Sequence, residues 1–333
     1  MKAILMTAPG GLDVLKLVEI AQPVLSSPHQ LLVRVHAAGV NPLDTKIRKL
    51  HFFYPNNLPV ILGVEGAGVV EQVGAAVTRF RSGDEVYFFG NGLGLEPGAY
   101  AEYTVINEEH VARKPSNVSM VEAAAIPVAL ITAWEALVDR AALKSGDKVL
   151  IHAGAGGVGH IAVQLARARG AQVAATISGK EKAELVKSFG AELAIDYWEQ
   201  DFVQEVLSWT SGRGADVILD TVGGATFCKS FQAVRMYGRI ATLLSTPCEL
   251  ADINHARLRN ISVGFVQMTA PSYLGDADAR RAQTRILEQG TLLFEKGKLR
   301  ILLSAVLPLE DVATAHRMVE EGHTSGKVVL QID

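Results

Sequence analysis

The chain has 333 residues, of which 49% are hydrophobic and 20% are charged, a balance that excludes a disordered, collagen-like or coiled-coil protein. This length exceeds what one hydrophobic core usually fills, so we expect two domains. Lys and Arg number 32 and Asp and Glu number 35, which gives a net charge of −3. Nothing in that balance attracts nucleic acid or an anionic membrane.

The only two cysteines, Cys228 and Cys248, are too few for a disulfide framework and lack the paired spacing of a structural zinc site. We therefore expect the two cysteines to act as small apolar side chains. Their small number also indicates a reducing compartment, so we expect a cytoplasmic protein. The amino-terminal apolar run ends at Pro9, too early for a signal peptide. The most apolar stretch, residues 123–138, is shorter than the ~20 residues of a membrane-spanning helix.

Short β-rich runs separated by Gly and Pro fill the first part of the chain and predict an irregular, mostly antiparallel β domain. From about Val121, helical patterns alternate with brief apolar strands, which indicates a doubly wound parallel sheet. A predicted loop over 269–278, a helix over 279–296 and a last strand over 327–331 return to the first domain. We thus expect a catalytic β-rich domain at 1–122 and 268–333 and a dinucleotide-binding domain at 123–267.

The most informative motif is Gly154-Ala155-Gly156-Gly157-Val158-Gly159, which follows a predicted strand and opens a predicted helix. Gly154 permits the tight turn, Gly156 lets the backbone approach a pyrophosphate, and Gly159 lets helix and strand pack closely. Gly157 and Val158 stand at the helix N-terminus, whose N–H groups bind anions. The sequence therefore predicts a dinucleotide site.

The residues after the second strand of this unit bear on which dinucleotide binds. Ser178 and Glu181 have the spacing of a capping box, which would turn Glu181 back on the Ser178 backbone and remove the only nearby acid. Ser178 and Lys182, with Lys180 as a weaker candidate, then hold a 2′-phosphate, so NADPH is favoured over NADH. Alternatively, these lysines are ordinary solvated charges.

Several motifs along nearly the whole chain carry a family resemblance. They include Gly39-Val40-Asn41-Pro42-Leu43-Asp44, Gly63-Val64-Glu65-Gly66, Gly98-Ala99-Tyr100, Asp220-Thr221-Val222-Gly223-Gly224 and Gly326-Lys327-Val328. Together they resemble the zinc-independent quinone oxidoreductase (zeta-crystallin-like) branch of the medium-chain dehydrogenase/reductase superfamily. The resemblance implies an α/β fold class, with a GroES-like β-rich catalytic domain and a Rossmann cofactor domain.

The resemblance also bears on metals. The zinc alcohol dehydrogenases of the superfamily carry a catalytic Cys where this sequence has Asn41 and a His where it has Val64. Their structural zinc lobe needs four cysteines after the position of Phe88, and this chain has none there. We therefore expect no metal site.

By resemblance, Asn41, Asp44 and Tyr54 border the nicotinamide and the acceptor, with Asn41 as an amide donor and Tyr54 as a hydroxyl donor or proton source. Each residue has a plainer interpretation: Asn41 shapes a turn, Asp44 caps the following helix, and Tyr54 is a surface aromatic.

The resemblance adds further cofactor contacts. It places Thr132 near the nicotinamide, Tyr197 near the adenosine 2′-phosphate, and Val222 and Lys327 at the cofactor. Alternatively, Tyr197 is a buried tyrosine at a strand end and Lys327 is an exposed lysine at the start of a strand.

These features predict an NADPH-dependent reductase of quinones or α,β-unsaturated carbonyls, which works by metal-free hydride transfer to a small electrophilic acceptor. A homodimer paired through an edge strand near 261–267 is expected with it. Two alternatives remain: a non-catalytic NADPH-binding protein that acts as a sensor or structural component, and a zinc-type alcohol dehydrogenase. The sequence leaves open the physiological acceptor, the proton donor, and the choice between hydride and single-electron transfer.

Overall fold

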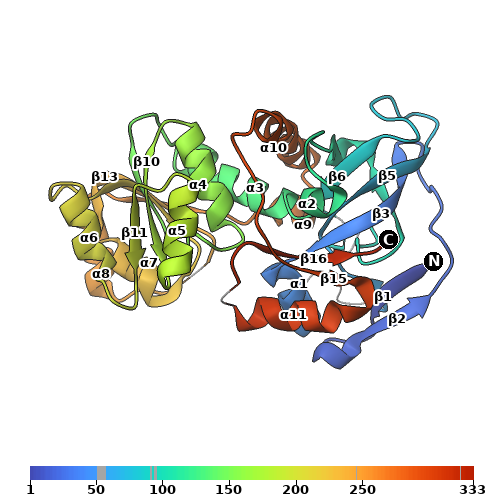
Figure 1. Cartoon of the computed structure of the whole chain (residues 1–333), viewed down its shortest axis with the longest axis horizontal. Helices are drawn as coiled ribbons and strands as arrows, with labels where there is room; N and C mark the ends of the chain where they lie inside the picture. Colours follow the sequence, from blue (N-terminus) through green and yellow to red (C-terminus); the bar gives the residue numbers. More distant parts are fainter. Residues whose placement is uncertain (51–57, 91, 94–95, 245, 323) are drawn as a thin grey trace. The chain divides into compact units, whose positions relative to one another are not determined.

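The computed structural model describes residues 1–50, 58–90, 92–93, 96–244, 246–322 and 324–333. The chain divides into two compact units, which Figure 1 colours by sequence. Unit 1 comprises Met1–Val128 and Thr269–Asp333, and unit 2 comprises Ala129–Met268. The first division falls inside helix α3 (Pro127–Trp134), later in the chain than the expected boundary at 122/123.

Unit 1 is built mainly from antiparallel strands, as its short β-rich runs predict. Its three-stranded sheet has the order β2-β1-β4, and its seven-stranded sheet has the order β15-β16-β3-β5-β6-β8, with β7 paired to β3. The strands are β1 (Lys2–Met6), β2 (Leu15–Glu19), β3 (Gln30–Val40), β4 (Val60–Ile61), β5 (Glu65–Val73), β6 (Glu85–Phe89), β7 (Tyr103–Asn107), β8 (Val111–Arg113), β15 (Leu303–Pro308) and β16 (Lys327–Gln331).

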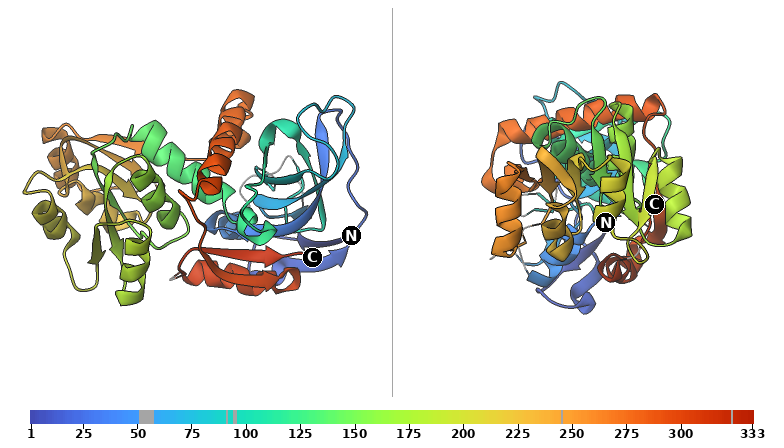
Figure 2. Two further views of the ribbon diagram at one scale, coloured as in Figure 1. Left: turned by 45° about the horizontal axis from the view of Figure 1, so that its top comes forward. Right: turned by 90° about the vertical axis from the view of Figure 1, so that its left-hand side faces the viewer.

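Several α-helices accompany these sheets in unit 1. They are α1 (Pro42–Leu50), α2 (Met120–Ala124), α9 (Ala270–Leu274), α10 (Ala277–Glu295) and α11 (Val312–Glu321). Helix α11 runs alongside β15 and β16, and both chain ends lie in this unit (Figure 2). The expectation of a loop over 269–278 is wrong, because α9 forms within it, with Pro271 in its first turn and Gly275 in the left-handed conformation at its end.

Unit 2 is a six-stranded parallel sheet with the order β11-β10-β9-β12-β13-β14, which confirms the doubly wound prediction. Its strands are β9 (Lys148–Ile151), β10 (Gln172–Ile177), β11 (Leu193–Asp196), β12 (Ala215–Asp220), β13 (Val234–Thr242) and β14 (Ser262–Phe265). Besides α3 and the π-helix Glu135–Arg140, its helices are α4 (Gly159–Ala168), α5 (Lys180–Ser188), α6 (Phe202–Trp209), α7 (Gly224–Ser230) and α8 (Leu250–Leu258).

One hydrophobic core of unit 2 joins the sheet to α6, α7 and α8. Phe202, Phe227 and Phe231 from the helices pack with Leu150 and Ile218 from the central strands. This arrangement explains why the strands of unit 2 are continuous apolar runs, since parallel strands covered by helices carry no solvent face.

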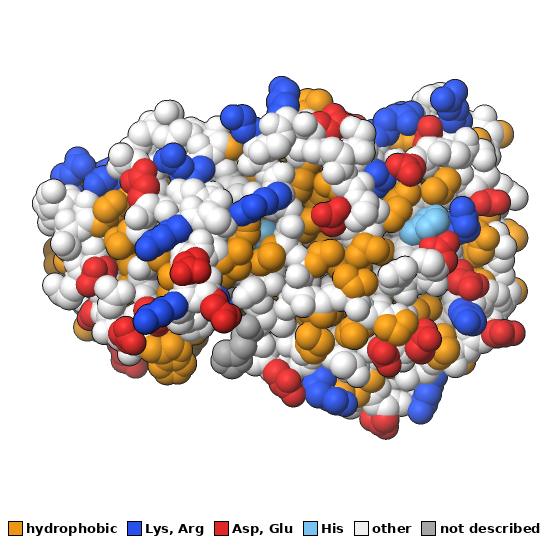
Figure 3. All heavy atoms as spheres, viewed as in Figure 1, with side chains coloured by type: hydrophobic (Ala, Val, Ile, Leu, Met, Phe, Trp, Pro, Cys, Tyr) orange, Lys and Arg blue, Asp and Glu red, His pale blue; other side chains and the backbone are white. Residues whose placement is uncertain are grey.

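In the part of the chain that the structure describes, no helix is both long and apolar enough to cross a membrane. On the face drawn in Figure 3, basic and acidic side chains are interspersed, and neither sign forms a large patch of its own.

Candidate functional site

The glycine motif of unit 2 forms the turn between β9 and α4. A Cβ atom at Gly159 would lie 2.1 Å from the Ala153 carbonyl oxygen, and one at Gly154 would lie 2.6 Å from the Ala175 Cβ. Both positions therefore require glycine for the close packing of turn, helix and sheet. Gly156, Gly157 and Val158 keep partial exposure at the start of α4, where helix N–H groups have no intrahelical partner. This geometry fits a dinucleotide pyrophosphate.

The capping box expected at Ser178 and Glu181 does not form. Helix α5 begins after Gly179, which has φ +81° and makes no side-chain cap. Instead the Lys182 Nζ donates to the Ser178 Oγ over 3.3 Å. Ser178 and Lys182, the two residues predicted for a 2′-phosphate, are thus close together. They meet through this direct hydrogen bond and not through a capping box.

An acidic residue that the sequence argument missed lies beside this pair. Asp196 ends β11, which is paired in parallel with β10, and its Oδ2 accepts the Gly179 N–H over 2.8 Å. The sequence separation of Asp196 from Gly179 hides this contact, because only the sheet order makes the two strand ends neighbours. The next residue, Tyr197, is 45% exposed with its ring against Trp198, so the alternative of a buried strand-end tyrosine is wrong.

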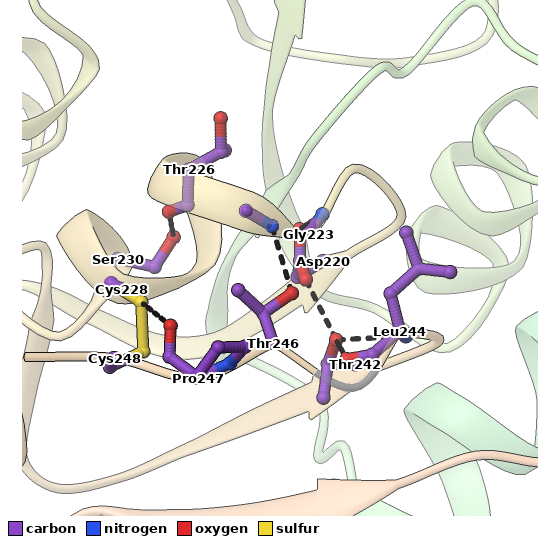
Figure 4. Close-up of a disulfide and its surroundings, with 11 residues drawn as sticks. Asp220, Gly223, Thr226, Cys228, Ser230, Thr242, Leu244, Thr246, Pro247 and Cys248 are labelled. Carbon is purple, nitrogen blue, oxygen red and sulfur yellow. Dashed lines mark hydrogen bonds between the residues drawn. A yellow bond between two sulfur atoms is a disulfide. The ribbon is translucent and has the colours of Figure 1, made fainter.

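The Asp220 carboxylate organises the second predicted cofactor turn. Its Oδ1 accepts the N–H groups of Val222 and Gly223. Its Oδ2 accepts the Thr242 hydroxyl over 2.7 Å (Figure 4). These bonds hold Val222, which is 47% exposed, at the carboxyl end of β12 on the same sheet edge as the glycine turn. Thr132, in contrast, is buried within α3, and its predicted cofactor contact stays a prediction.

A disulfide lies next to this turn and corrects the expectation of two separate apolar cysteines. Cys228 of α7 bonds to Cys248, and Gly224 donates its N–H to Thr246 in the same segment (Figure 4). The 20-residue separation gives no spacing signal. The two cysteines meet because α7 follows β12 and the Cys248 segment follows the adjacent strand β13.

The charged centre of unit 1 is a buried cluster at the end of β3. The Asn41 Nδ2 donates to the Glu65 Oε1 over 2.8 Å, and the Lys327 Nζ donates to the same oxygen over 2.8 Å and to the Asn41 Oδ1. The Glu65 Oε2 accepts the Val128 N–H over 2.7 Å. Lys327 is only 4% exposed, so the alternative of an exposed lysine is wrong.

Asp44 lies beside this cluster and is fully buried. Its two oxygens accept the N–H groups of Asn41 and Val64 over 2.9 and 3.2 Å. The bond to Asn41 is the reciprocal half of a capping box at the start of α1, so Asp44 does cap the helix. Burial raises the pKa of the Asp44 carboxyl to about 7, and the Glu65 charge adds to the rise, while the two N–H bonds and Lys327 oppose it.

Behind Asp44 lies a chain of buried donors that the sequence argument did not assign. Arg48 contacts the His316 Nδ1 at 3.5 Å, and the His316 Nε2 contacts the Tyr100 hydroxyl at 3.3 Å. Because a guanidinium only donates, the His316 Nδ1 accepts, its Nε2 carries the proton, and the Tyr100 hydroxyl accepts from that Nε2.

The ionisation of these groups agrees with that direction. Burial and the Arg48 charge lower the pKa of His316 to about 3, and burial keeps the pKa of Tyr100 well above its ordinary value. Arg48 also donates to the Glu320 Oε1 over 2.5 Å, and because its guanidinium does not release a proton, this chain of contacts does not carry protons past Arg48. Tyr100 belongs to the Gly98-Ala99-Tyr100 motif of the family resemblance, whereas nothing in the sequence pattern marks His316.

The donor set at positions 41, 64 and 65 does not suit zinc. Val64 has no donor atom, and both Glu65 oxygens already accept hydrogen bonds. Among the described residues, no group of three or more His, Cys, Asp or Glu side chains is arranged to hold a metal ion. Tyr54 lies outside the described residues, and its predicted role stays a prediction.

Family models match two parts of the chain: residues 27–116 match an alcohol dehydrogenase GroES-like domain, and residues 189–330 match a zinc-binding dehydrogenase. A quinone oxidoreductase of Pseudomonas aeruginosa is 34% identical over 99% of both chains. The chain belongs to the quinone oxidoreductase branch of the medium-chain dehydrogenase/reductase superfamily. As a member of this branch, it is an oxidoreductase, and the GroES-like and Rossmann predictions are confirmed.

Other relatives of the family differ in the activity that they are named for. The chloroplastic NADPH-dependent alkenal/one oxidoreductase of Arabidopsis thaliana is 34% identical over 99% of this chain and 79% of its own. A solved NAD-dependent alcohol dehydrogenase has a TM-score of 0.91 at 34% identity, with both chains fully covered. The Escherichia coli quinone oxidoreductase in complex with NADPH has a TM-score of 0.86 at 28% identity, covering 99% of this chain and 100% of its own.

Proposed function

We propose that the protein is an NADPH-dependent reductase of quinones or α,β-unsaturated carbonyl compounds that works without a metal. The observation that carries this proposal is that Asn41, Glu65 and Lys327 hydrogen-bond to one another. An amide and an ion pair therefore lie where the resemblance puts the catalytic zinc ligands of the zinc alcohol dehydrogenases. Without a Lewis acid a simple alcohol is not activated for hydride loss, whereas a quinone or enone is already electron-poor. Its developing oxyanion needs only hydrogen-bond donors.

The residues for the cofactor are those of unit 2. Gly156, Gly157, Val158 and Gly159 would hold the pyrophosphate, and Ser178 and Lys182 the 2′-phosphate. Bound NADPH supplies a hydride, which is a proton with two electrons. The Arabidopsis relative is named as NADPH-dependent and the Escherichia coli relative was solved with NADPH, and both names support this choice. Thr132, Tyr197 and Val222 complete the proposed cofactor contacts.

In unit 1, Asn41 and Lys327 present the polar groups that an acceptor could meet, and Asp44 fixes the backbone on which Asn41 stands. Asn41, Asp44 and Tyr54 remain our proposed catalytic residues. Asp44 keeps Asn41 in place through the N–H bond at the start of α1, so its proposed contribution does not depend on direct contact with the acceptor.

We also propose a homodimer formed through β14. This strand is the edge of the unit 2 sheet, and its Phe265 is 61% exposed. An unpaired edge with an exposed aromatic side chain is a ready surface for pairing with the same strand of a second copy.

The deciding experiment measures NADPH oxidation with a naphthoquinone and with an enal, each with and without a strong metal chelator. We expect turnover with at least one acceptor class, no effect of the chelator, and no reaction of NADP⁺ with a simple alcohol. Tight NADPH binding without turnover across a broad acceptor panel would favour the non-catalytic alternative. Activity that the chelator abolishes would favour a zinc enzyme.

A further inference from the structure

Lys327 is a buried cation in unit 1 with one fixed anionic partner. Its side chain is 5% exposed and that of Glu65 is fully buried, and the Nζ to Oε1 distance is 2.8 Å. Taking such a pair out of water costs free energy that its mutual attraction often fails to recover, so an apolar pair would serve stability as well or better. Stability alone therefore does not explain why this lysine is buried here.

The local backbone is shaped to hold the lysine there. β16 pairs with β3 in the register Val328 to Val40, which places Lys327 beside Asn41. Gly326, just before it, has φ +82°, and a Cβ there would lie 2.2 Å from the Leu302 carbonyl oxygen. Only glycine permits this entry into the strand.

The Glu65 carboxylate also depends on a glycine. A Cβ at Gly39 would lie 2.2 Å from the Glu65 Oε1, so the strand makes room for the carboxylate only because position 39 carries no side chain. Two separate glycine positions thus bring the ammonium and the carboxylate together.

The described hydrogen bonds of the cluster leave one N–H donor on the Lys327 ammonium and one on the Asn41 amide. An ammonium has three N–H donors, and the described contacts of Lys327 use two, on the Asn41 Oδ1 and the Glu65 Oε1. Asn41 and Lys327 keep 3% and 4% exposure, whereas Glu65 and Asp44 keep none. The small remaining exposure of the cluster therefore belongs to Asn41 and Lys327.

We propose that the Lys327 ammonium binds the carbonyl oxygen of the acceptor and stabilises the negative charge that forms there during reduction. This inference rests on the proposed function. The transferred hydride forms a new C–H bond on an enone β-carbon or a bond to the quinone ring system, and the displaced π electrons end as a lone pair on the acceptor oxygen. The acceptor is thereby reduced, NADPH is oxidised to NADP⁺, and water supplies the proton that completes the product.

In this arrangement Glu65 acts through the lysine, and Asn41 helps to orient the lysine in addition to its own proposed role toward the acceptor. The Glu65 carboxylate and the Asn41 carbonyl fix two of the ammonium hydrogens, which aims the third at the acceptor without reorganisation as charge develops. Lys327 is thus a catalytic residue toward the acceptor, in place of the cofactor contact that the resemblance implies.

The first test needs no turnover. para-Nitrophenol mimics the oxyanion, and its phenolate is yellow, so its ionisation is read directly from absorbance with the enzyme and NADP⁺ in excess. We expect wild type to shift the bound probe toward phenolate by at least about tenfold, and the Lys327→Met variant to bind it as the neutral phenol. Equal ionisation on the two proteins, or no binding to wild type, overturns the proposal.

The second test separates catalysis from cofactor binding. In Lys327→Met we expect the single-turnover rate of acceptor reduction to fall about 100-fold, the effect of losing one oxyanion donor. The dissociation constant for NADPH should change less than about threefold. The exposed Lys16→Met variant is the matched control and should keep wild-type values.

Removal of Lys327 leaves Glu65 as a buried unpaired charge, which can unfold unit 1. The double variant Lys327→Met with Glu65→Gln removes both charges and keeps both shapes, so it tests the same proposal in a folded protein. A rate within threefold of wild type in the folded variant, or weakened NADPH binding with an unchanged rate, overturns the role of Lys327 and leaves the proposed function intact. A wild type that reduces no acceptor overturns both.

Discussion

Replacement of Asp44 by Asn should remove a loss of stability that unit 1 suffers as the pH rises. Burial raises the pKa of the folded Asp44 carboxyl to about 7, above the ordinary 3.8 of an unfolded chain. Between these values the folded state holds one proton more than the unfolded state, so the free energy of unfolding falls as the pH rises. Below pH 3.8 both states are protonated, and the carboxyl then costs no stability.

The magnitude follows from that difference. Each pH unit inside the window lowers the free energy of unfolding by about 1.4 kcal/mol, so from pH 5 to pH 8 wild type should lose about 3 kcal/mol relative to a variant that cannot ionise. Asn has a single acceptor oxygen, whereas the Asp44 oxygens accept two backbone N–H groups. The variant should therefore pay a pH-independent penalty of about 1–3 kcal/mol.

The assay must report on the correct unit. All three tryptophans, Trp134, Trp198 and Trp209, lie in unit 2, so their fluorescence in urea follows that unit. Far-UV circular dichroism follows the unfolding of both units. A transition that appears in circular dichroism but not in tryptophan fluorescence therefore belongs to unit 1. The stability of Asp44→Asn relative to wild type should rise by about 3 kcal/mol from pH 5 to pH 8, and the variant should match or exceed wild type by pH 8. The exposed Asp13→Asn variant is the control, and parallel pH profiles for wild type and Asp44→Asn would refute the reasoning.

Three further predictions concern unit 2. Lys182→Ala should weaken NADPH binding about tenfold and leave NADH binding unchanged in a fluorescence titration, whereas the exposed Lys187→Ala should change neither; equal losses for both cofactors would remove the 2′-phosphate site. Replacement of Cys228 and Cys248 together by Ser should lower the stability of unit 2 by about 3 kcal/mol in urea followed by tryptophan fluorescence, since the disulfide closes a loop with a separation of 20 residues; an unchanged midpoint would show that the bond contributes nothing. Phe265→Lys should convert the proposed dimer to a monomer by light scattering, and a wild type that is already monomeric would end that proposal.

The sequence by itself determined where many of the strands and helices lie and that unit 2 is a parallel-sheet, dinucleotide-binding domain. Its apolar runs and glycine turn have a local cause, because a parallel strand needs continuous burial and a tight turn needs glycine. The predicted last strand over 327–331 agrees with β16 residue for residue. The predicted helix over 279–296 corresponds to α10, which begins two residues earlier and ends one residue earlier, whereas α9 was missed because five residues carry too little pattern.

Only the tertiary structure decided which distant residues meet. Asp196 reaches Gly179 because β11 and β10 are neighbours, and Cys228 reaches Cys248 because β12 and β13 are. From the sequence, Lys327 could equally be an exposed residue at the start of a strand. In the structure, the register of β16 on β3 places it against Asn41 and Glu65. Sheet order and register arise from packing across the whole chain, and no window of sequence contains them.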